Sequence, residues 1–291
     1  MNKLPSVLLY ETISYVPETI GCVLCIDSVI SHKVSSRVDV FHTMLEEIWG
    51  LHGIREQKFV DTMATCKDHL GNCEFYSYVS KTNKIFSYDL KTGNIQQHLV
   101  ELPDDLPDLG LGAILTPSPD RMFLYITGGI HSGTYVAKTI RISVANMDME
   151  RLAYFVKGRT AHAAEFCRGN LYIFGGFNKG SVLECEALEN GAWSEIGNLR
   201  TGMEKPGAYA YKNEIFVSGY NSDHIAVYNA MTKSWRELSI QFEEPQNNSV
   251  MFGHRNICYV LRSEHLYELD LDSEEVLRMN DVTKSSWWSH T

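Results

Sequence analysis

The chain has 291 residues, a net charge of −10 and an apolar fraction of 44%, values ordinary for a protein that folds around a hydrophobic core. An acidic chain lacks the dense basic surface that nucleic acid or an anionic membrane attracts, so we expect neither as a partner. The seven cysteines are scattered, and no leader pattern or long apolar run is present. These features indicate a reduced, cytoplasmic compartment without membrane insertion. Secretion with a removed leader is the alternative.

Residues 1–61 are predicted to form a separate N-terminal segment. Apolar residues recur at helical spacing from Val38 to Trp49, and Gly50 follows them. This pattern predicts a short amphipathic helix.

Three potential metal ligands lie upstream of this helix. Cys22, Cys25 and His32 are of the types that bind tetrahedral zinc, and their spacing suits three of the four ligands. The stretch resembles the second half of a B-box zinc finger, and this resemblance implies zinc as a cofactor. No cysteine or histidine precedes Cys22 to supply the first half. Buried cysteines in strands, without metal, are the alternative.

The chain from residue 62 onward repeats. Asn170, Asn213 and Asn256 are 43 residues apart, and each lies between two short apolar runs. This arrangement predicts a series of hairpins whose turns need residues tolerant of positive φ.

A second hairpin follows in each period. Tyr228 and Trp235 lie seven residues apart on either side of a polar turn, and Cys185 and Trp193 have the same relation with one additional residue. Each period therefore contains four short strands, as in the blade of a β-propeller. The predicted cycles are Thr62–His98, Leu109–Phe155, Ala161–Ile196, Lys205–Leu238 and Gln246–Met279.

Two of the periods contain a strand that ends in adjacent glycines. "LYITGG" (Leu124–Gly129) and "LYIFGG" (Leu171–Gly176) resemble the kelch repeat, and the next period keeps Gly219 and Trp235. The resemblance implies an all-β, kelch-type β-propeller over residues 62–291. Such propellers commonly close with six blades, whereas five are visible here. A sixth would use N- or C-terminal strands. The repeat glycines are Gly128, Gly129, Gly175, Gly176 and Gly219.

The glycine pairs do not match a phosphate-binding loop. "GGIHSGTYVAKT" (Gly128–Thr139) is flanked by predicted strands, and no helix follows it. Adjacent glycines at a strand end instead favour a turn with positive φ and close backbone packing. We expect a scaffold role.

No local motif predicts catalysis. His162, His254, His265 and Glu165 are chemically competent side chains, but none lies in a serine elbow. Some kelch-like propellers are copper-radical oxidases, so a metal-dependent oxidase is one alternative. The expected function is instead non-catalytic protein binding, as a scaffold or a substrate-recognition subunit. A structural subunit of a larger complex is the other alternative.

The predicted binding surface consists of the loops that lead into the first strand of each blade, since a rigid scaffold presents such loops on one face. Arginine is a favoured anchor for acidic peptides because its planar guanidinium binds carboxylates in two places. The predicted partner-binding residues are Arg159, His162, Arg200, Glu204, Lys205, Gln246 and Asn247.

Overall fold

The computed structural model describes residues 74–78, 82–89, 94–104, 106, 108–242, 249–262 and 265–281. These residues form twenty-one strands and no helix. The predicted N-terminal helix and zinc ligands lie outside the described residues. The all-β class predicted from the repeats is confirmed for the described part of the chain.

The strands form five antiparallel sheets in chain order, which we number sheets 1 to 5. Sheet 1 contains β1 (Glu74–Tyr78), β2 (Lys84–Asp89) and β3 (Asn94–Leu99). Sheet 2 contains β4 (Ile114–Pro117), β5 (Phe123–Thr127), β8 (Thr139–Ser143) and β9 (Met149–Arg151). A small hairpin between β5 and β8 contains β6 (Ile130–His131) and β7 (Thr134–Tyr135).

The last three sheets have four strands each, and each strand pairs with the next in sequence. Sheet 3 contains β10 (Ala163–Cys167), β11 (Asn170–Phe174), β12 (Glu184–Glu189) and β13 (Ala192–Asn198). Sheet 4 contains β14 (Glu204–Tyr211), β15 (Glu214–Tyr220), β16 (His224–Asn229) and β17 (Ser234–Gln241). Sheet 5 contains β18 (Ser249–His254), β19 (Ile257–Arg262), β20 (His265–Asp270) and β21 (Glu275–Asp281).

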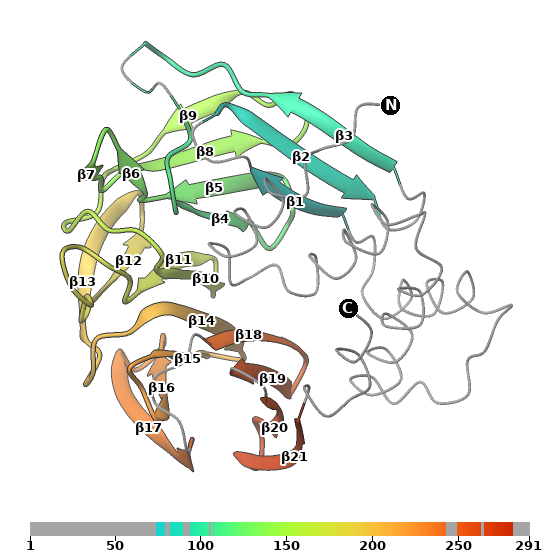
Figure 1. The fold of residues 1–291 in the computed structure, drawn as a ribbon, viewed down its shortest axis with the longest axis vertical. Coiled ribbons are helices and arrows are strands. Elements are labelled where there is room, and N and C mark those ends of the chain that lie inside the picture. Colours follow the sequence, from blue (N-terminus) through green and yellow to red (C-terminus); the bar gives the residue numbers. More distant parts are fainter. Residues whose placement is uncertain are drawn as a thin grey trace, which may run out of the picture.

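The five sheets lie along an arc, in chain order, with the first strand of each four-stranded sheet on the inner side (Figure 1). Neighbouring inner strands touch: β4 contacts β10, β10 contacts β14, and β14 contacts β18. The fourth strands β9, β13, β17 and β21 lie on the outer side. No strand within the described ranges joins sheet 5 to sheet 1.

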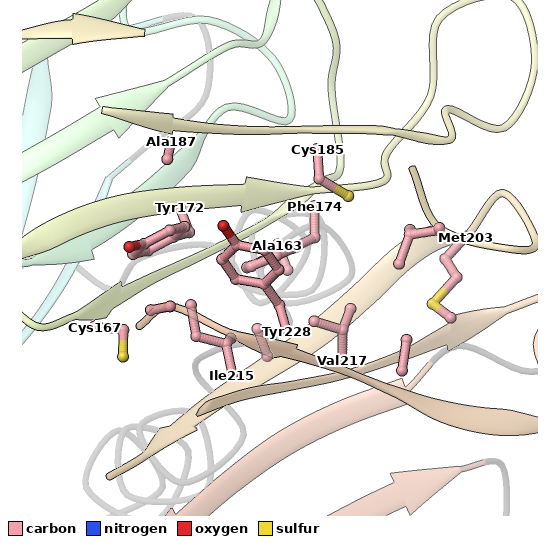
Figure 2. Packing of buried hydrophobic residues seen from close by; sticks show 14 residues of the cluster. Ala163, Cys167, Tyr172, Phe174, Cys185, Ala187, Met203, Ile215, Val217 and Tyr228 are labelled. Carbon is pink, nitrogen blue, oxygen red and sulfur yellow. The ribbon is translucent and has the colours of Figure 1, made fainter. Parts of the chain in front are cut away.

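The hydrophobic core is divided into clusters, each between two neighbouring sheets. Between sheets 3 and 4, Tyr172 and Phe174 of β11 face Tyr228 of β16 and Val217 of β15 (Figure 2). The ring centroids of Tyr172 and Tyr228 are 5.7 Å apart. A sheet in the middle of the arc is covered on both faces, which explains why its second strand, β11 or β15, is mainly apolar.

Tryptophans of the fourth strands connect sheets 3 and 4 to the sheets that precede them. Trp235 of β17 donates its indole N–H to the carbonyl oxygen of Ile196 in β13, at 2.9 Å. Trp193 of β13 donates to the carbonyl oxygen of Ala153, which follows β9, at 3.0 Å. The repeated tryptophan therefore both fills the core and satisfies a polar group of the neighbouring sheet.

The predicted cycles from Leu109 onward agree with sheets 2 to 5. Sheet 1 has three described strands, and the start of its predicted cycle at Thr62 lies outside the described residues. Two local details differ. The positive φ of the first hairpin turns falls on Lys212 and Arg255 rather than on the asparagines that follow them. Trp193 pairs with Leu188, not with Cys185, because the turn between β12 and β13 contains only two residues. The β-bulge of this hairpin lies beyond Trp193, between the pairs Cys185–Gly197 and Glu186–Glu195, and does not change the pairing of Trp193.

Candidate functional site

The connections of the sheets gather at two edges. We call the edge where the second strand of each four-stranded sheet ends the glycine-pair edge, and the opposite edge, formed by the short turns, the hairpin edge. Because the strands alternate in direction, the connection into the next sheet also lies at the glycine-pair edge. Its described connections span residues 100–104, 106, 108–113, 128–138, 152–162, 175–183, 199–203 and 221–223.

The glycine pairs anchor these connections to the sheets. Gly175 and Gly176 have φ values of 60° and 97°, which L side chains rarely adopt. A Cβ atom on Gly175 would lie 2.5 Å from the carbonyl oxygen of Met203 in the connection to sheet 4. Gly176 donates its N–H to that same oxygen at 2.8 Å. The glycines therefore permit a turn and a close backbone contact, and the N–H of Gly176 is hydrogen-bonded within the protein.

Sheet 2 repeats this geometry. Gly128 and Gly129 have φ values of 66° and 101°, and Gly129 donates its N–H to the carbonyl oxygen of Arg159 at 2.8 Å. Gly219 of β15 acts differently, because its φ is not positive. A Cβ atom there would lie 2.9 Å from both Met203 and Pro206, so Gly219 is needed for close packing alone.

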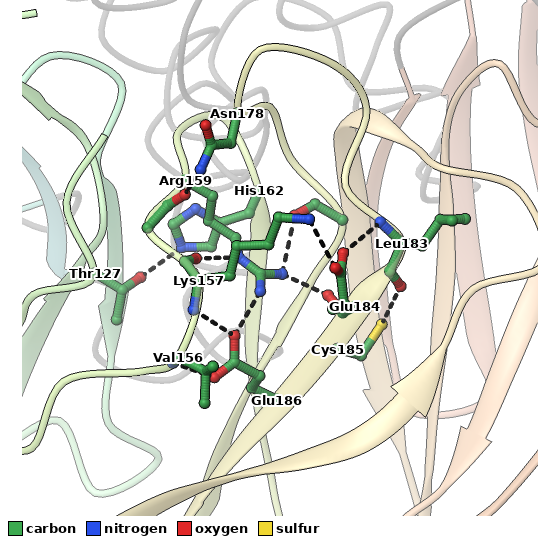
Figure 3. Close-up of polar contacts among 12 residues, drawn as sticks. Thr127, Val156, Lys157, Arg159, His162, Asn178, Leu183, Glu184, Cys185 and Glu186 are labelled. Atoms are coloured by element: carbon green, nitrogen blue, oxygen red, sulfur yellow. Dashed lines mark hydrogen bonds and ion pairs between the residues drawn. The ribbon is translucent and has the colours of Figure 1, made fainter. Parts of the chain in front are cut away.

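A buried ion pair joins the connection between sheets 2 and 3 to β12 (Figure 3). Arg159 donates from Nη2 to Oε1 of Glu186 at 2.5 Å, and both residues are 0% exposed. Its Nη1 donates to the carbonyl oxygens of Glu184 and Gly175 at 2.5 and 3.2 Å. Its Nε donates to the carbonyl oxygen of Lys157 at 3.0 Å. Arg159 thus joins its own connection to β12 and to the glycine pair.

The carboxylate of Glu186 also accepts hydrogen bonds from the backbone of the same connection. Its Oε2 accepts the backbone N–H of Val156 at 2.6 Å, and its Oε1 accepts that of Lys157 at 3.4 Å. Burial lowers the pKa of Arg159, and the charge of Glu186 opposes this effect. Arg159 therefore offers no surface to a partner. Its predicted place in the binding face is wrong, because the guanidinium is buried and forms its hydrogen bonds inside the protein.

His162 is also fully buried, which removes it from the predicted binding face. Its Nε2 lies 2.7 Å from the hydroxyl oxygen of Thr127, in sheet 2. Burial, together with the positive charge of Arg159, holds the pKa of His162 well below its usual range. His162 is therefore neutral and acts as a link between sheets 2 and 3.

Arg200 lies in the connection into sheet 4, and Glu204 and Lys205 are the first two residues of β14. The side chain of Arg200 is 76% exposed and forms an ion pair with Glu237 at 2.9 Å. Glu204 accepts a hydrogen bond from the hydroxyl of Ser181 at 2.8 Å, and Lys205 is half-buried with a φ of 44°. Gln246 and Asn247 lie outside the described residues.

The described cysteines are buried and unreactive in character. Burial raises the pKa of the Cys167 thiol to about 11 and that of Cys185 to about 12, and it raises that of Cys258 further. Within the described ranges, no three histidine, cysteine or acidic side chains are grouped as metal ligands. Cys22, Cys25 and His32 lie outside those ranges, so zinc binding by them stays a prediction. Among the described residues there is also no helix long and apolar enough to cross a membrane.

Two features at the inner strands and the glycine-pair edge were not predicted. Glu165 of β10 accepts the backbone N–H of Phe166 at 2.9 Å, and burial raises its pKa to about 7. Asp108, His131 and Lys138 form a chain of polar contacts beside β6. The sequence contains His131 and Lys138 within the glycine-rich stretch already discussed, but nothing in it places Asp108 beside them.

Comparisons with known proteins do not assign the chain to a family. No family model matches the chain, and no curated protein matches it.

Proposed function

We propose that the chain is a kelch-type β-propeller that binds a protein partner without catalysis, through exposed side chains of the glycine-pair edge. The observation that carries the proposal is the regular succession of antiparallel sheets whose first strands contact one another along the inside of an arc. This succession, with tryptophan links and glycine pairs at corresponding places, is the pattern of propeller blades. A sixth blade from terminal strands would close the ring.

The glycine-pair edge suits recognition because its connections are held at fixed positions by buried hydrogen bonds. Lys179 and Arg200 project from two neighbouring connections and are exposed. A rigid backbone with exposed, variable side chains is the usual arrangement of a binding surface. The two cations favour a partner segment that carries carboxylates.

Affinity purification of the full chain, followed by quantitative mass spectrometry, tests this function. The double variant Lys179→Glu/Arg200→Glu reverses two charges at the glycine-pair edge. The matched control Lys212→Glu/Lys233→Glu reverses two exposed lysines at the hairpin edge. We expect the first variant to lose the partner and the control to keep it. Equal retention or equal loss in the two variants would contradict binding at this edge.

The same experiment separates recognition from a purely structural role. A subunit that completes its ring against a neighbour would elute in one stable assembly whatever the charge at the glycine-pair edge. A recognition module would release its partner when Lys179 and Arg200 are reversed, and the chain itself would stay folded.

A further inference from the structure

Three ionisable side chains meet at the glycine-pair edge of sheet 2. Nζ of Lys138 lies 2.6 Å from Nε2 of His131. Nδ1 of His131 lies 3.2 Å from Oδ1 of Asp108. Lys138 is only 4% exposed, whereas the side chains of His131 and Asp108 are 12% and 21% exposed. The amine is therefore almost enclosed, and its histidine and aspartate neighbours lie between it and the solvent.

The backbone holds these groups in place. Lys138 directly precedes β8, His131 ends β6, and Asp108 lies in the connection from β3 to β4. An isolated β-bridge joins Leu111 to Ile130, next to His131. Oδ1 of Asp108 also accepts the N–H of Gly110 at 2.6 Å. Three separate segments thus converge through regular hydrogen bonds, and the convergence does not depend on one flexible side chain.

The neighbouring charges favour one tautomer of the imidazole, although Nδ1 of His131 and Oδ1 of Asp108 are not aligned as a hydrogen bond. The carboxylate of Asp108 beside Nδ1 favours a proton on that nitrogen, which leaves the lone pair of Nε2 directed at Lys138. Nζ of Lys138 also donates to the carbonyl oxygen of Leu109 at 2.8 Å. His131 is therefore oriented as a proton acceptor for the amine.

The amine itself is shifted toward its neutral form. Burial lowers the pKa of Lys138 to about 7, and the negative charge of Asp108 opposes this shift. Burial, followed by the charge of Lys138, lowers the pKa of His131. At pH 7 about half of the Lys138 amines are neutral, compared with on the order of one in a thousand for an exposed lysine. A neutral amine in contact with a base is a competent nucleophile.

We propose that Lys138 is a nucleophilic amine that captures a small aldehyde as an imine, with His131 as the proton acceptor and Asp108 as the residue that orients it. The Nζ lone pair attacks the carbonyl carbon, and a C–N bond forms. An amine proton passes to Nε2 of His131, which delivers it to the carbonyl oxygen and so forms a hydroxyl. The second amine proton then reaches this hydroxyl by the same route. Loss of this hydroxyl as water then gives the C=N bond. Both amine hydrogens leave with the water, and no oxidant or reductant is needed.

The surroundings favour a small, neutral ligand. Because Lys138 is only 4% exposed, we restrict the proposal to a short aldehyde. A site that disfavours the ammonium ion through burial tolerates a neutral imine better than a charged product. This activity is separate from the proposed binding of a protein partner, and its test uses neither Lys179→Glu nor Arg200→Glu.

The test treats the full chain with propanal and sodium cyanoborohydride, which converts an imine to a stable secondary amine. Peptide mapping by mass spectrometry then measures the rate of modification at each lysine. The exposed lysines Lys179, Lys212 and Lys233 of the same molecule serve as internal references. At pH 7 we expect Lys138 to react at least about tenfold faster, since its roughly thousandfold excess of neutral amine outweighs lower basicity and restricted access. Its rate should level off above about pH 8, whereas the reference rates should continue to rise toward about pH 10.

Variants distinguish a reactive Lys138 amine from a Lys138 whose role is only to stabilise the connections by hydrogen bonds. In His131→Gln we expect the rate at Lys138 to fall about tenfold or more, because the proton acceptor is lost. His98→Gln, which removes a histidine that contacts Ser87 in sheet 1, should leave the rate unchanged. Lys138→Arg should abolish labelling at this position.

The pH dependence of the modification rate at Lys138 in the wild-type protein tests the proposal even if His131→Gln does not fold. Lys138 that reacts no faster than Lys179 at pH 7, or whose rate rises in parallel with Lys179, overturns the proposal. If His131→Gln is folded by circular dichroism, an unchanged rate at Lys138 overturns it as well, as does an equal loss of rate in His98→Gln.

Discussion

Replacement of Arg159 by methionine is expected to destabilise the protein severely. Methionine fills a similar volume but supplies none of the hydrogen bonds that Arg159 donates to Glu186 and to the carbonyl oxygens of Lys157, Gly175 and Glu184. Glu186 would keep only backbone partners for a carboxylate that is 0% exposed. Removal of one member of a buried ion pair costs about 3–5 kcal/mol, and we expect a loss of about 4 kcal/mol in the free energy of unfolding.

Urea denaturation followed by tryptophan fluorescence and circular dichroism measures this loss. Arg200→Met is the matched control, because Arg200 has the same side chain and an ion pair with Glu237 but is 76% exposed. Its cost should not exceed about 1 kcal/mol. The double variant Arg159→Met/Glu186→Met should be more stable than Arg159→Met, since no unpaired charge is left in the interior. If Arg159→Met costs no more than Arg200→Met, the buried pair does not hold the connection as described here.

Three further changes test the remaining features. The pKa of Glu165 is raised from 4.5 to about 7, so the folded state loses stability as the pH rises through this interval. Glu165→Gln should match the wild type near pH 4.5 and exceed its stability by about 1–2 kcal/mol at pH 8 in urea titrations, whereas an equal difference at both pH values would contradict the shift. Gly176→Ala should cost about 2–4 kcal/mol in the same assay, because Gly176 has a φ of 97° and the new Cβ would lie 2.7 Å from the carbonyl oxygen of Thr160. Gly180→Ala, with no atom within 4 Å of the new Cβ, should stay within about 0.5 kcal/mol. The thiol of Cys185, with its pKa raised to about 12, should resist iodoacetamide in the folded protein and react rapidly in urea, and alkylation at equal rates would show that the site opens.

The sequence predicted the strands and their grouping because these features depend on local order. An apolar run, a turn residue and a second apolar run recur at a nearly constant interval, and neighbouring strands in the chain are neighbours in each sheet. The spacing from Tyr228 to Trp235 even predicted a registered pair. Where the interval changed, at Trp193, a turn of only two residues pairs Trp193 with Leu188, and the spacing from Cys185 did not reveal how long the turn is.

The candidate site was much less predictable. "VKGRTAH" (Val156–His162) has the composition of a solvated loop, and the prediction treated Arg159 and His162 as exposed. Their burial depends on Glu186, which lies 27 residues later in the chain, and on Thr127 in the preceding sheet. One signal was present, because Glu186 stands between Cys185 and Ala187 in the middle of a buried strand. A lone carboxylate in such a place requires a cationic partner, but the sequence does not say which one.

The same burial changes what the connections can do. Arg159 binds its connection to β12 and to Gly175, and Gly129 binds the carbonyl of Arg159 from the side of sheet 2. A segment bonded into both neighbouring sheets has little conformational freedom to lose when a partner binds, so less of the binding energy is spent on ordering it. Under the proposed function, Arg159 therefore contributes to affinity indirectly, by fixing the backbone. The choice of partner then depends on the exposed side chains that the fixed connections present, with Lys179 and Arg200 the first to test.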